Sequence, residues 1–157
     1  MSYLLVKDTV NGAEGRVYIT QNGRSVEVAG MNNIQANAEI QSNEMKVIGT
    51  RTIQSKNSGA KLTGKGNIYY GTNLFTDMVL QYINTGVMPE FDIQITNNDK
   101  STTLGSQVMA FYGCTLTGTI PLAILDDEEK MMKYDFEFAY TRVARLEAFK
   151  DPAQLGS

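Results

Sequence analysis

Residues 132–141 read Met-Lys-Tyr-Asp-Phe-Glu-Phe-Ala-Tyr-Thr, and this stretch decides the fold class. Apolar and aromatic side chains occupy every second position from Met132 to Tyr140, and the positions between them are mainly charged or polar. Because successive side chains of a strand point to opposite faces, the pattern predicts a strand with one aromatic face against a core and one polar face against water.

The same alternation predicts a second strand at about residues 62–70. Gly64 and Gly66 fall on its apolar face, where the missing side chains predict a close approach of neighbouring groups or a bend. Further strands are predicted at residues 16–20, 26–29, 45–54, 90–96 and 107–120. Asn22-Gly23 predicts a tight turn between the first two of these.

One segment follows a helical period instead. In residues 73–84, apolar side chains recur at three- and four-residue spacing, at Leu74, Phe75, Met78, Val79 and Tyr82. This predicts an amphipathic helix that packs on the sheet through Leu74, Met78 and Tyr82. Thr72 or Asn73 can cap its start, and Gly86 can cap its end.

The overall organisation follows from length and composition. The chain has 157 residues, of which 42% are hydrophobic and 20% are charged, the balance of an ordinary folded domain. We predict one domain over residues 1–150 and a C-terminal tail at 151–157. Strands precede and follow a single helix without regular alternation, so the predicted fold class is mainly β, a small β-barrel or sandwich with one amphipathic helix.

Two segments are too polar for core strands, residues 30–44 and 97–106. We predict long loops there, either mobile or ordered by a partner. Polar strand faces and polar loops also leave sheet edges that need protection. Assembly with neighbouring subunits provides that protection, and so does solvent exposure with charged edges.

The residue inventory gives no support for catalysis. The chain has no histidine, which removes the commonest general base and the commonest metal ligand. Cys114 is the only cysteine, and its apolar neighbours predict a buried thiol. Residues 64–67 lack the order of a phosphate-binding loop, and the acidic run 126–129 lacks the spacing of a calcium loop. We therefore predict no enzyme activity, no cofactor and no metal site.

Charge and hydropathy argue against nucleic-acid-binding, membrane and secreted proteins. A net charge of -3 gives no overall basic field for holding nucleic acid by its phosphates, and we expect no sequence-specific binding to nucleic acid. The longest apolar stretches, such as residues 120–125, are far shorter than the roughly 20 residues of a membrane helix. The N-terminal residues do not resemble a secretory signal, so we expect synthesis in the cytoplasm and no membrane insertion.

The order of several short motifs adds a family resemblance. The motifs are Asn-Gly-Ala-Glu-Gly-Arg-Val-Tyr-Ile at 11–19, Gly-Thr-Arg at 49–51, Lys-Asn-Ser-Gly at 56–59, Gly-Lys-Gly-Asn-Ile-Tyr-Tyr at 64–70, and the helix from Phe75 to Tyr82 followed by Gly-Val-Met-Pro-Glu-Phe at 86–91. Together they resemble the tail tube proteins of contractile phages, defective prophages and phage-tail-like bacteriocins of Gram-positive bacteria. The match covers about the first hundred residues in register, and the final strands fit by pattern.

This resemblance implies a structural subunit that forms hexameric rings stacked into the inner tube of a contractile tail or R-type bacteriocin. The implied partners are copies of the chain, the sheath protein, the tape-measure protein, and the baseplate and tail terminator proteins. DNA can pass through the lumen, and the subunit belongs to a virion tail or an extracellular bacteriocin particle made in the bacterial cytoplasm. Two alternatives stay open: a tube protein of a related secretion system, and a monomeric β-barrel that binds a ligand.

The resemblance also gives roles to the polar residues. Alternate positions of a continuous barrel face its lumen, which makes channel-lining candidates of Lys61, Thr63, Lys65, Asn67, Lys133, Asp135, Glu137 and Thr141. The alternative is that they face solvent on an isolated sandwich. The segment 30–44 would reach an adjacent subunit, with contact candidates Met31, Asn32, Asn33, Ile34, Gln35, Glu39, Ile40 and Glu44.

Overall fold

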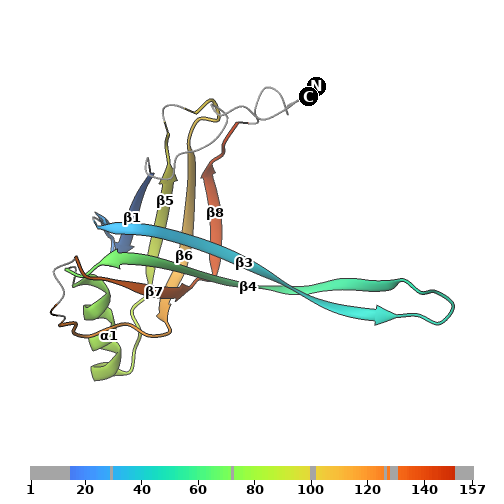
Figure 1. Cartoon of the computed structure of the whole chain (residues 1–157), viewed down its shortest axis with the longest axis horizontal. Coiled ribbons are helices and arrows are strands. Elements are labelled where there is room, and N and C mark those ends of the chain that lie inside the picture. The colour runs from blue at the N-terminus through green and yellow to red at the C-terminus, as the bar shows by residue number, and fades with distance from the viewer. Residues whose placement is uncertain are drawn as a thin grey trace.

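The structure, a computed structural model, describes residues 15–28, 30–71, 73–99, 102–125, 127 and 131–150. Within these residues the chain forms eight strands and one helix (Figure 1). In chain order they are β1 (Gly15–Gln21), β2 (Arg24–Glu27), β3 (Met31–Lys46), β4 (Ile53–Tyr69), α1 (Leu74–Thr85), β5 (Phe91–Asn97), β6 (Gln107–Thr117), β7 (Lys133–Ala139) and β8 (Arg142–Glu147). The predicted mainly β class with one helix is confirmed.

The strands form one antiparallel sheet that folds over itself at β6. The strand order is β2-β1-β5-β6-β7-β4-β3, and β8 pairs with β6 off this path. The first part of β6 pairs with β5 and β8, whereas residues 115–117 pair with β7. Figure 1 shows the consequence: β3, β4 and β7 cross β1, β5, β6 and β8 as a second layer.

The core lies between these two layers and against α1. The aromatic face predicted for residues 132–141 is confirmed, because Tyr134, Phe136, Phe138 and Tyr140 are all buried. The ring of Phe136 stacks on that of Phe75 from α1, with 4.5 Å between their centroids. The aromatic residues of β7 thus join the helix to the sheet.

Gly64 and Gly66 confirm the predicted close approach. In the register of β4 and β7, Gly64 lies opposite Phe138 and Gly66 lies opposite Phe136. A Cβ atom on Gly66 would lie 2.6 Å from Cζ of Phe136, and one on Gly64 would overlap the ring of Phe138. Each ring therefore occupies the space that a side chain on β4 would need.

Two local signals had the predicted effect. Asn22 and Gly23 both have positive φ, 53° and 78°, and form the tight turn between β1 and β2. Gly86 ends α1 in a left-handed conformation, and its N–H donates to the carbonyl of Tyr82 at 2.8 Å. Asn73 occupies the N-cap position but makes no side-chain capping bond, and Thr72 lies outside the described residues.

The packing predicted for α1 is correct in part. Met78 is buried together with Phe75, and Leu74 is partly buried against the core. Tyr82 is 49% exposed, so its predicted packing on the sheet is wrong. The buried residues, Phe75 and Met78, lie in the first half of the helix.

The predictions for residues 30–44 and 45–54 are wrong. The first segment is not a loop but most of β3, and the second is not a strand but contains the turn between β3 and β4. The two strands pair along their whole length, from Met31 opposite Ile68 to Lys46 opposite Ile53. The pairing uses main-chain hydrogen bonds, which a polar sequence can form as readily as an apolar one, so polarity alone did not exclude a strand here.

The C-terminal strands also differ from the prediction. The strand at 132–141 ends at Ala139, and β8, which was not predicted, follows after a short turn and pairs with β6. The described residues of 97–106 outside β5 form no helix or strand. The tail at 151–157 and most of the acidic run 126–129 fall outside the described residues. No helix in the described part of the chain has the length and apolar character to span a membrane.

Candidate assembly surfaces

One face of β3, β4 and β7 is polar across all three strands. In the strand register, Lys65 of β4 lies between Gln35 of β3 and Glu137 of β7. Most side chains predicted to line a channel share this surface, which we call the polar face: Lys61, Thr63, Lys65, Asn67, Lys133, Asp135 and Glu137. The alternation places them together because the aromatic side chains of the same strands fill the core on the other side.

A chain of side-chain hydrogen bonds crosses the polar face. The amide of Asn32 donates to Oδ1 of Asn67 at 2.7 Å, and the amide of Asn67 donates to Oδ1 of Asp135 at 2.8 Å. Along β3, Gln35 donates to Asn37 at 3.0 Å. These contacts tie the three strands together through neutral amides as well as through their backbones.

The charges on the polar face balance. It carries three lysines and three carboxylates, all exposed: Lys61, Lys65, Lys133, Glu39, Asp135 and Glu137. The one ion pair found among the described residues, Arg16–Glu27, joins β1 to β2 and is not part of the polar face. The face therefore presents mixed, solvated charge with no net sign.

Thr141 does not join the polar face. It follows the end of β7, where its backbone N–H and its hydroxyl both donate to the carbonyl of Tyr112, at 3.0 and 3.2 Å. Its side chain lies against Gly113 of β6. The alternation that suggested a channel position ends two residues earlier, at Ala139.

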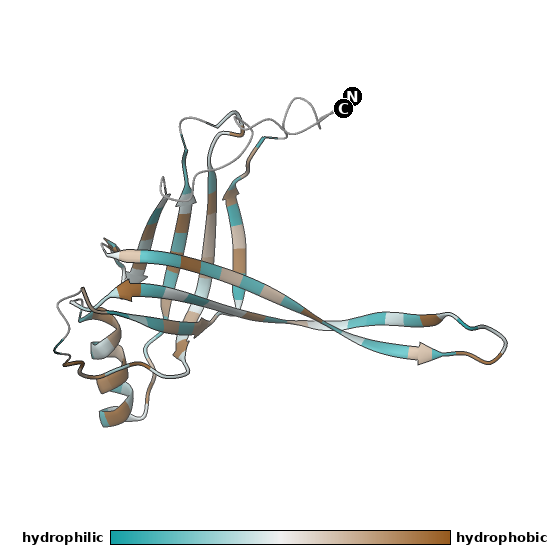
Figure 2. Ribbon diagram, viewed as in Figure 1, coloured by the Kyte–Doolittle hydropathy of each residue, from teal (hydrophilic) through white to brown (hydrophobic). Residues whose placement is uncertain are grey.

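The hairpin of β3 and β4 extends well beyond the body of the molecule (Figure 1). Every residue from 37 to 61 is exposed, and we call this segment the overhang. At its start, the alternation of apolar and polar side chains continues from the body. Ala38 and Ile40 lie on the same side of β3 as the partly buried Ile34, and Glu39 lies on the side of the polar face. Figure 2 shows these alternating bands along β3. Ile40 is 58% exposed because this chain supplies nothing to cover it.

The residues predicted to contact a neighbouring subunit all lie on β3, in three different settings. Met31 and Ile34 pack partly against the chain's own core. Asn32, Asn33 and Gln35 belong to the polar face. Glu39, Ile40 and Glu44 lie on the overhang.

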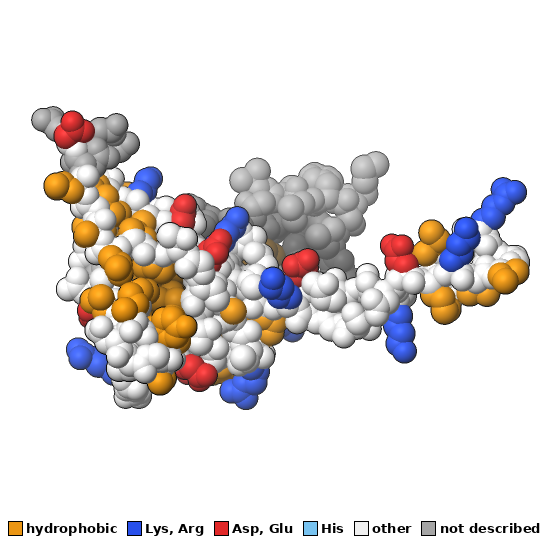
Figure 3. All heavy atoms as spheres, turned by 90° about the horizontal axis from the view of Figure 1, so that it is seen from below, with side chains coloured by type: hydrophobic (Ala, Val, Ile, Leu, Met, Phe, Trp, Pro, Cys, Tyr) orange, Lys and Arg blue, Asp and Glu red, His pale blue; other side chains and the backbone are white. Residues whose placement is uncertain are grey.

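The hairpin tip, residues 45–53, is a surface that the sequence analysis missed. Its apolar side chains are exposed, Ile48 completely: Met45, Val47, Ile48 and Ile53. Lys46 and Arg51 add positive charge beside them, and Figure 3 shows hydrophobic and basic side chains together at this end. The apolar side chains were visible in the sequence, but they were assigned to a predicted strand at residues 45–54.

Two open apolar grooves lie on the body. The hairpin-base groove, of about 520 Å³, lies where the hairpin meets β2 and the start of α1, and it is lined by Val26, Glu27, Val28, Gly30, Tyr69, Tyr70, Gly71 and Leu74. The helix-end groove, of about 660 Å³, lies between the second half of α1 and the end of β6, and its lining includes Val79, Tyr82, Ile83, Met88, Leu116 and Leu122. Both offer apolar surface to a partner.

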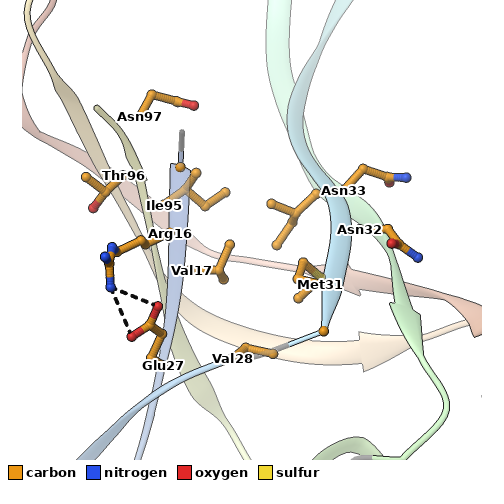
Figure 4. A pocket seen from close by; sticks show the side chains of 13 residues that line it. Arg16, Val17, Glu27, Val28, Met31, Asn32, Asn33, Ile95, Thr96 and Asn97 are labelled. Atoms are coloured by element: carbon orange, nitrogen blue, oxygen red, sulfur yellow. Dashed lines mark hydrogen bonds and ion pairs between the residues drawn. The ribbon is translucent and has the colours of Figure 1, made fainter. Parts of the chain in front are cut away.

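A third cleft, of about 410 Å³, opens between β1, β5 and the start of β3 (Figure 4). Val17, Ile95 and Met31 line its interior. Its charged side chains, Arg16 and Glu27, bind each other at 3.2 Å. This arrangement leaves the cleft without a charged group directed at a ligand.

The chemistry of Cys114 agrees with a structural role. The side chain is fully buried, as predicted, and its thiol donates to the carbonyl of Phe111 at 3.4 Å. Burial raises the pKa of Cys114 to about 12, so the thiol stays protonated at neutral pH and is a poor nucleophile. In the described part of the chain, no cluster of three or more histidine, cysteine, aspartate or glutamate side chains could hold a metal ion.

A comparison with protein families matches residues 2–147 to the family described as "Phage tail tube protein". Two relatives come from Bacillus subtilis (strain 168). The phage-like element PBSX protein XkdM is 26% identical over 87% of this chain and 90% of its own length. The uncharacterized protein YqbM is 27% identical over 98% of this chain and 97% of its own length.

A solved structure has the same fold. It is a chain in the sheath–tube complex of PVC, an extracellular contractile injection system, in the extended state. The TM-score is 0.62 at 13% sequence identity, over 91% of this chain and 94% of that chain. At this identity the likeness concerns the fold.

Proposed function

Because the chain belongs to the phage tail tube protein family, we propose that it assembles with copies of itself into hexameric rings, which stack into the inner tube of a contractile tail or R-type bacteriocin. The protein is a structural tail subunit and not an enzyme. On this proposal the polar face lines the channel, and the overhang lies against a neighbouring subunit.

The overhang carries this proposal. Its start, next to the body, keeps an apolar side at Ala38, Ile40 and Ala60, although this chain provides no core to cover it. Because Ile40 is 58% exposed, covering the rest of its side chain contributes about 1–2 kcal/mol, and a ring repeats that gain at each interface. A neighbouring body that covers Ala38 and Ile40 leaves Glu39 and Lys61 facing water, as in the chain's own sandwich.

The free edge of β3 supports the same arrangement. This strand of 16 residues is at one end of the sheet order and pairs only with β4 among the described strands. A long unpaired edge invites strand addition, and natural proteins rarely leave one open. In a closed ring, a neighbouring subunit occupies each such edge, and main-chain hydrogen bonds then hold the ring together.

The polar face suits a passage for large cargo. Its lysines balance its carboxylates, and neutral amides fill the space between them. A channel wall with no net charge neither binds a polyanion tightly nor repels it strongly. We assign the seven side chains from Lys61 to Glu137 on this face to the channel wall, where DNA or a tape-measure protein slides past them.

The remaining partners follow from a tube at the centre of a contractile particle. The sheath surrounds the tube, and baseplate and terminator proteins close its two ends. The similarity to a chain from a sheath–tube complex supports this placement. The subunit is made in the bacterial cytoplasm and acts in an assembled particle, a virion tail or an extracellular bacteriocin.

Electron microscopy of the purified chain tests this function. The protein is first fractionated by size-exclusion chromatography, then concentrated and examined in negative stain. Rings with six subunits or hollow tubes are expected. A chain that stays monomeric at high concentration, both alone and with preformed tube fragments as seeds, would contradict the proposal and favour a monomeric ligand-binding protein.

A further inference from the structure

We infer that the hairpin tip of one copy docks in the hairpin-base groove of a second copy. This inference rests on the proposed tube function and specifies a contact within it. Three features of the molecule support it: the position of the two surfaces, their apolar character and their charge.

The two surfaces lie at opposite ends of the same pair of strands. Gly30, directly before β3, and Tyr69, the last residue of β4, line the groove. Lys46, the last residue of β3, and Ile53, the first of β4, lie at the tip. At about 3.3 Å per residue, a strand of 16 residues separates tip and groove by about 50 Å. Copies displaced along the strands by this length bring tip to groove, a head-to-tail contact that can repeat.

Both surfaces expose large apolar side chains that lack cover. At the tip these include Val47, Ile48 and Ile53, and in the groove they include Val26, Tyr69 and Tyr70. The groove volume of about 520 Å³ lies within the range of sites that enclose a bound ligand, and it has ample room for the side chain of Ile48. Docking therefore removes apolar surface from water on both copies.

The charges are compatible. The tip, residues 45–53, carries Lys46 and Arg51 and no carboxylate, which gives +2. No lysine or arginine lines the groove, and its Glu27 is paired with Arg16 at 3.2 Å. Of the charges that flank the groove, Asp77 is exposed in the first turn of α1 and Lys133 lies opposite Tyr69 in the strand register, so these two balance. A basic tip therefore meets no like charge inside the groove.

The helix-end groove is the competing acceptor. It is larger, at about 660 Å³, but neither an acidic nor a basic side chain lines it. It also lies beside the end of β6 rather than at the base of the hairpin. Its position does not match the tip, so it serves as the control site.

Disulfide cross-linking between copies tests the inference. Full-length Ile48→Cys is mixed with full-length Val26→Cys under assembling conditions and then oxidised. Because the native Cys114 is fully buried, it stays in place, and the unmodified chain serves as a blank. A covalent dimer is expected in the mixture and in neither variant alone. The control mixes Ile48→Cys with Leu122→Cys, in the helix-end groove, and no dimer is expected.

Electron microscopy of the same samples separates the two proposals. Tubes without a cross-link between positions 48 and 26 would overturn the docking contact and leave the tube function intact. A cross-link from position 48 to position 122 in place of position 26 would also overturn it. Samples with neither rings, tubes nor cross-links would contradict both proposals.

Discussion

The body and the start of the overhang share the same alternation of apolar and polar side chains but differ in what covers the apolar side. In the body, Phe136 and Phe138 of β7 are completely buried between the two layers of the sheet. In the overhang, Ala38 and Ile40 occupy the equivalent side of β3 and lie in water. The body is therefore stabilised within one chain, whereas this chain leaves the apolar side of the overhang uncovered. Substitutions in the body should therefore change the free energy of unfolding of the monomer, whereas substitutions in the overhang should change its assembly.

The largest effect on folding is expected at Phe136. Its ring stacks on Phe75 and fills the space above Gly66, with no exposed surface. Phe136→Ala should lower the free energy of unfolding by about 3–5 kcal/mol, because the surrounding groups cannot close the cavity. Urea denaturation of the monomer measures it. A loss below about 1 kcal/mol would mean that the body is not packed as described.

A smaller effect is expected at Gly66. A Cβ atom there would meet Phe136 at 2.6 Å and the carbonyl of Asn33 at 2.8 Å, so Gly66→Ala should lower the unfolding free energy by about 1–3 kcal/mol. Gly71→Ala is the matched control, because nothing lies within 4 Å of the added atom. Equal unfolding curves for the two variants would contradict the close approach of β4 and β7.

A still smaller effect is expected on the polar face. Asn67 accepts from Asn32 and donates to Asp135, so Asn67→Ala breaks both bonds. A loss of about 0.5–1.5 kcal/mol in unfolding free energy is expected, since water competes for exposed polar groups. Lys65→Ala, one alternation away, is the control and should leave stability nearly unchanged. If the control is as destabilised as Asn67→Ala, the hydrogen-bonded chain is not the cause.

The smallest effect on the monomer is expected at Ile40. Its side chain is already 58% exposed, so Ile40→Asp should change the unfolding free energy by less than about 0.5 kcal/mol. The same variant should strongly impair assembly, because it places a charge on the side that a neighbour must cover. Size-exclusion chromatography across a concentration series measures this. Normal tubes from Ile40→Asp would contradict the role of the overhang.

The alternation in residues 132–141 and 62–70 predicted the body well because both strands pack on a core made by the same chain. The hairpin was misassigned for a corresponding reason. Ile34, Ala36, Ala38 and Ile40 do alternate with polar residues, but small side chains and many amides made the segment resemble a loop. Exposed apolar side chains at 45–53 resembled a core strand. A sequence pattern marks burial without showing which chain provides the cover.

The candidate surfaces show the same limit. Membership of the polar face could be predicted for seven residues, because strand alternation alone decides it. The prediction failed for Thr141, because β7 ends at Ala139 although the alternation of the sequence continues past that residue. The two grooves could not be predicted, because each combines residues from segments far apart in the sequence, such as Val26 with Tyr70.

Amide hydrogen exchange of the overhang tests the central claim most directly, by comparing the monomer with the assembled form. Few buried contacts hold residues 37–61 in the isolated chain, so their amides should exchange rapidly in the monomer and become strongly protected in tubes. Amides of β6 and β7 should be protected in both forms. Equal protection of the overhang in monomer and tube would show that the hairpin does not depend on a neighbour, and would contradict the account.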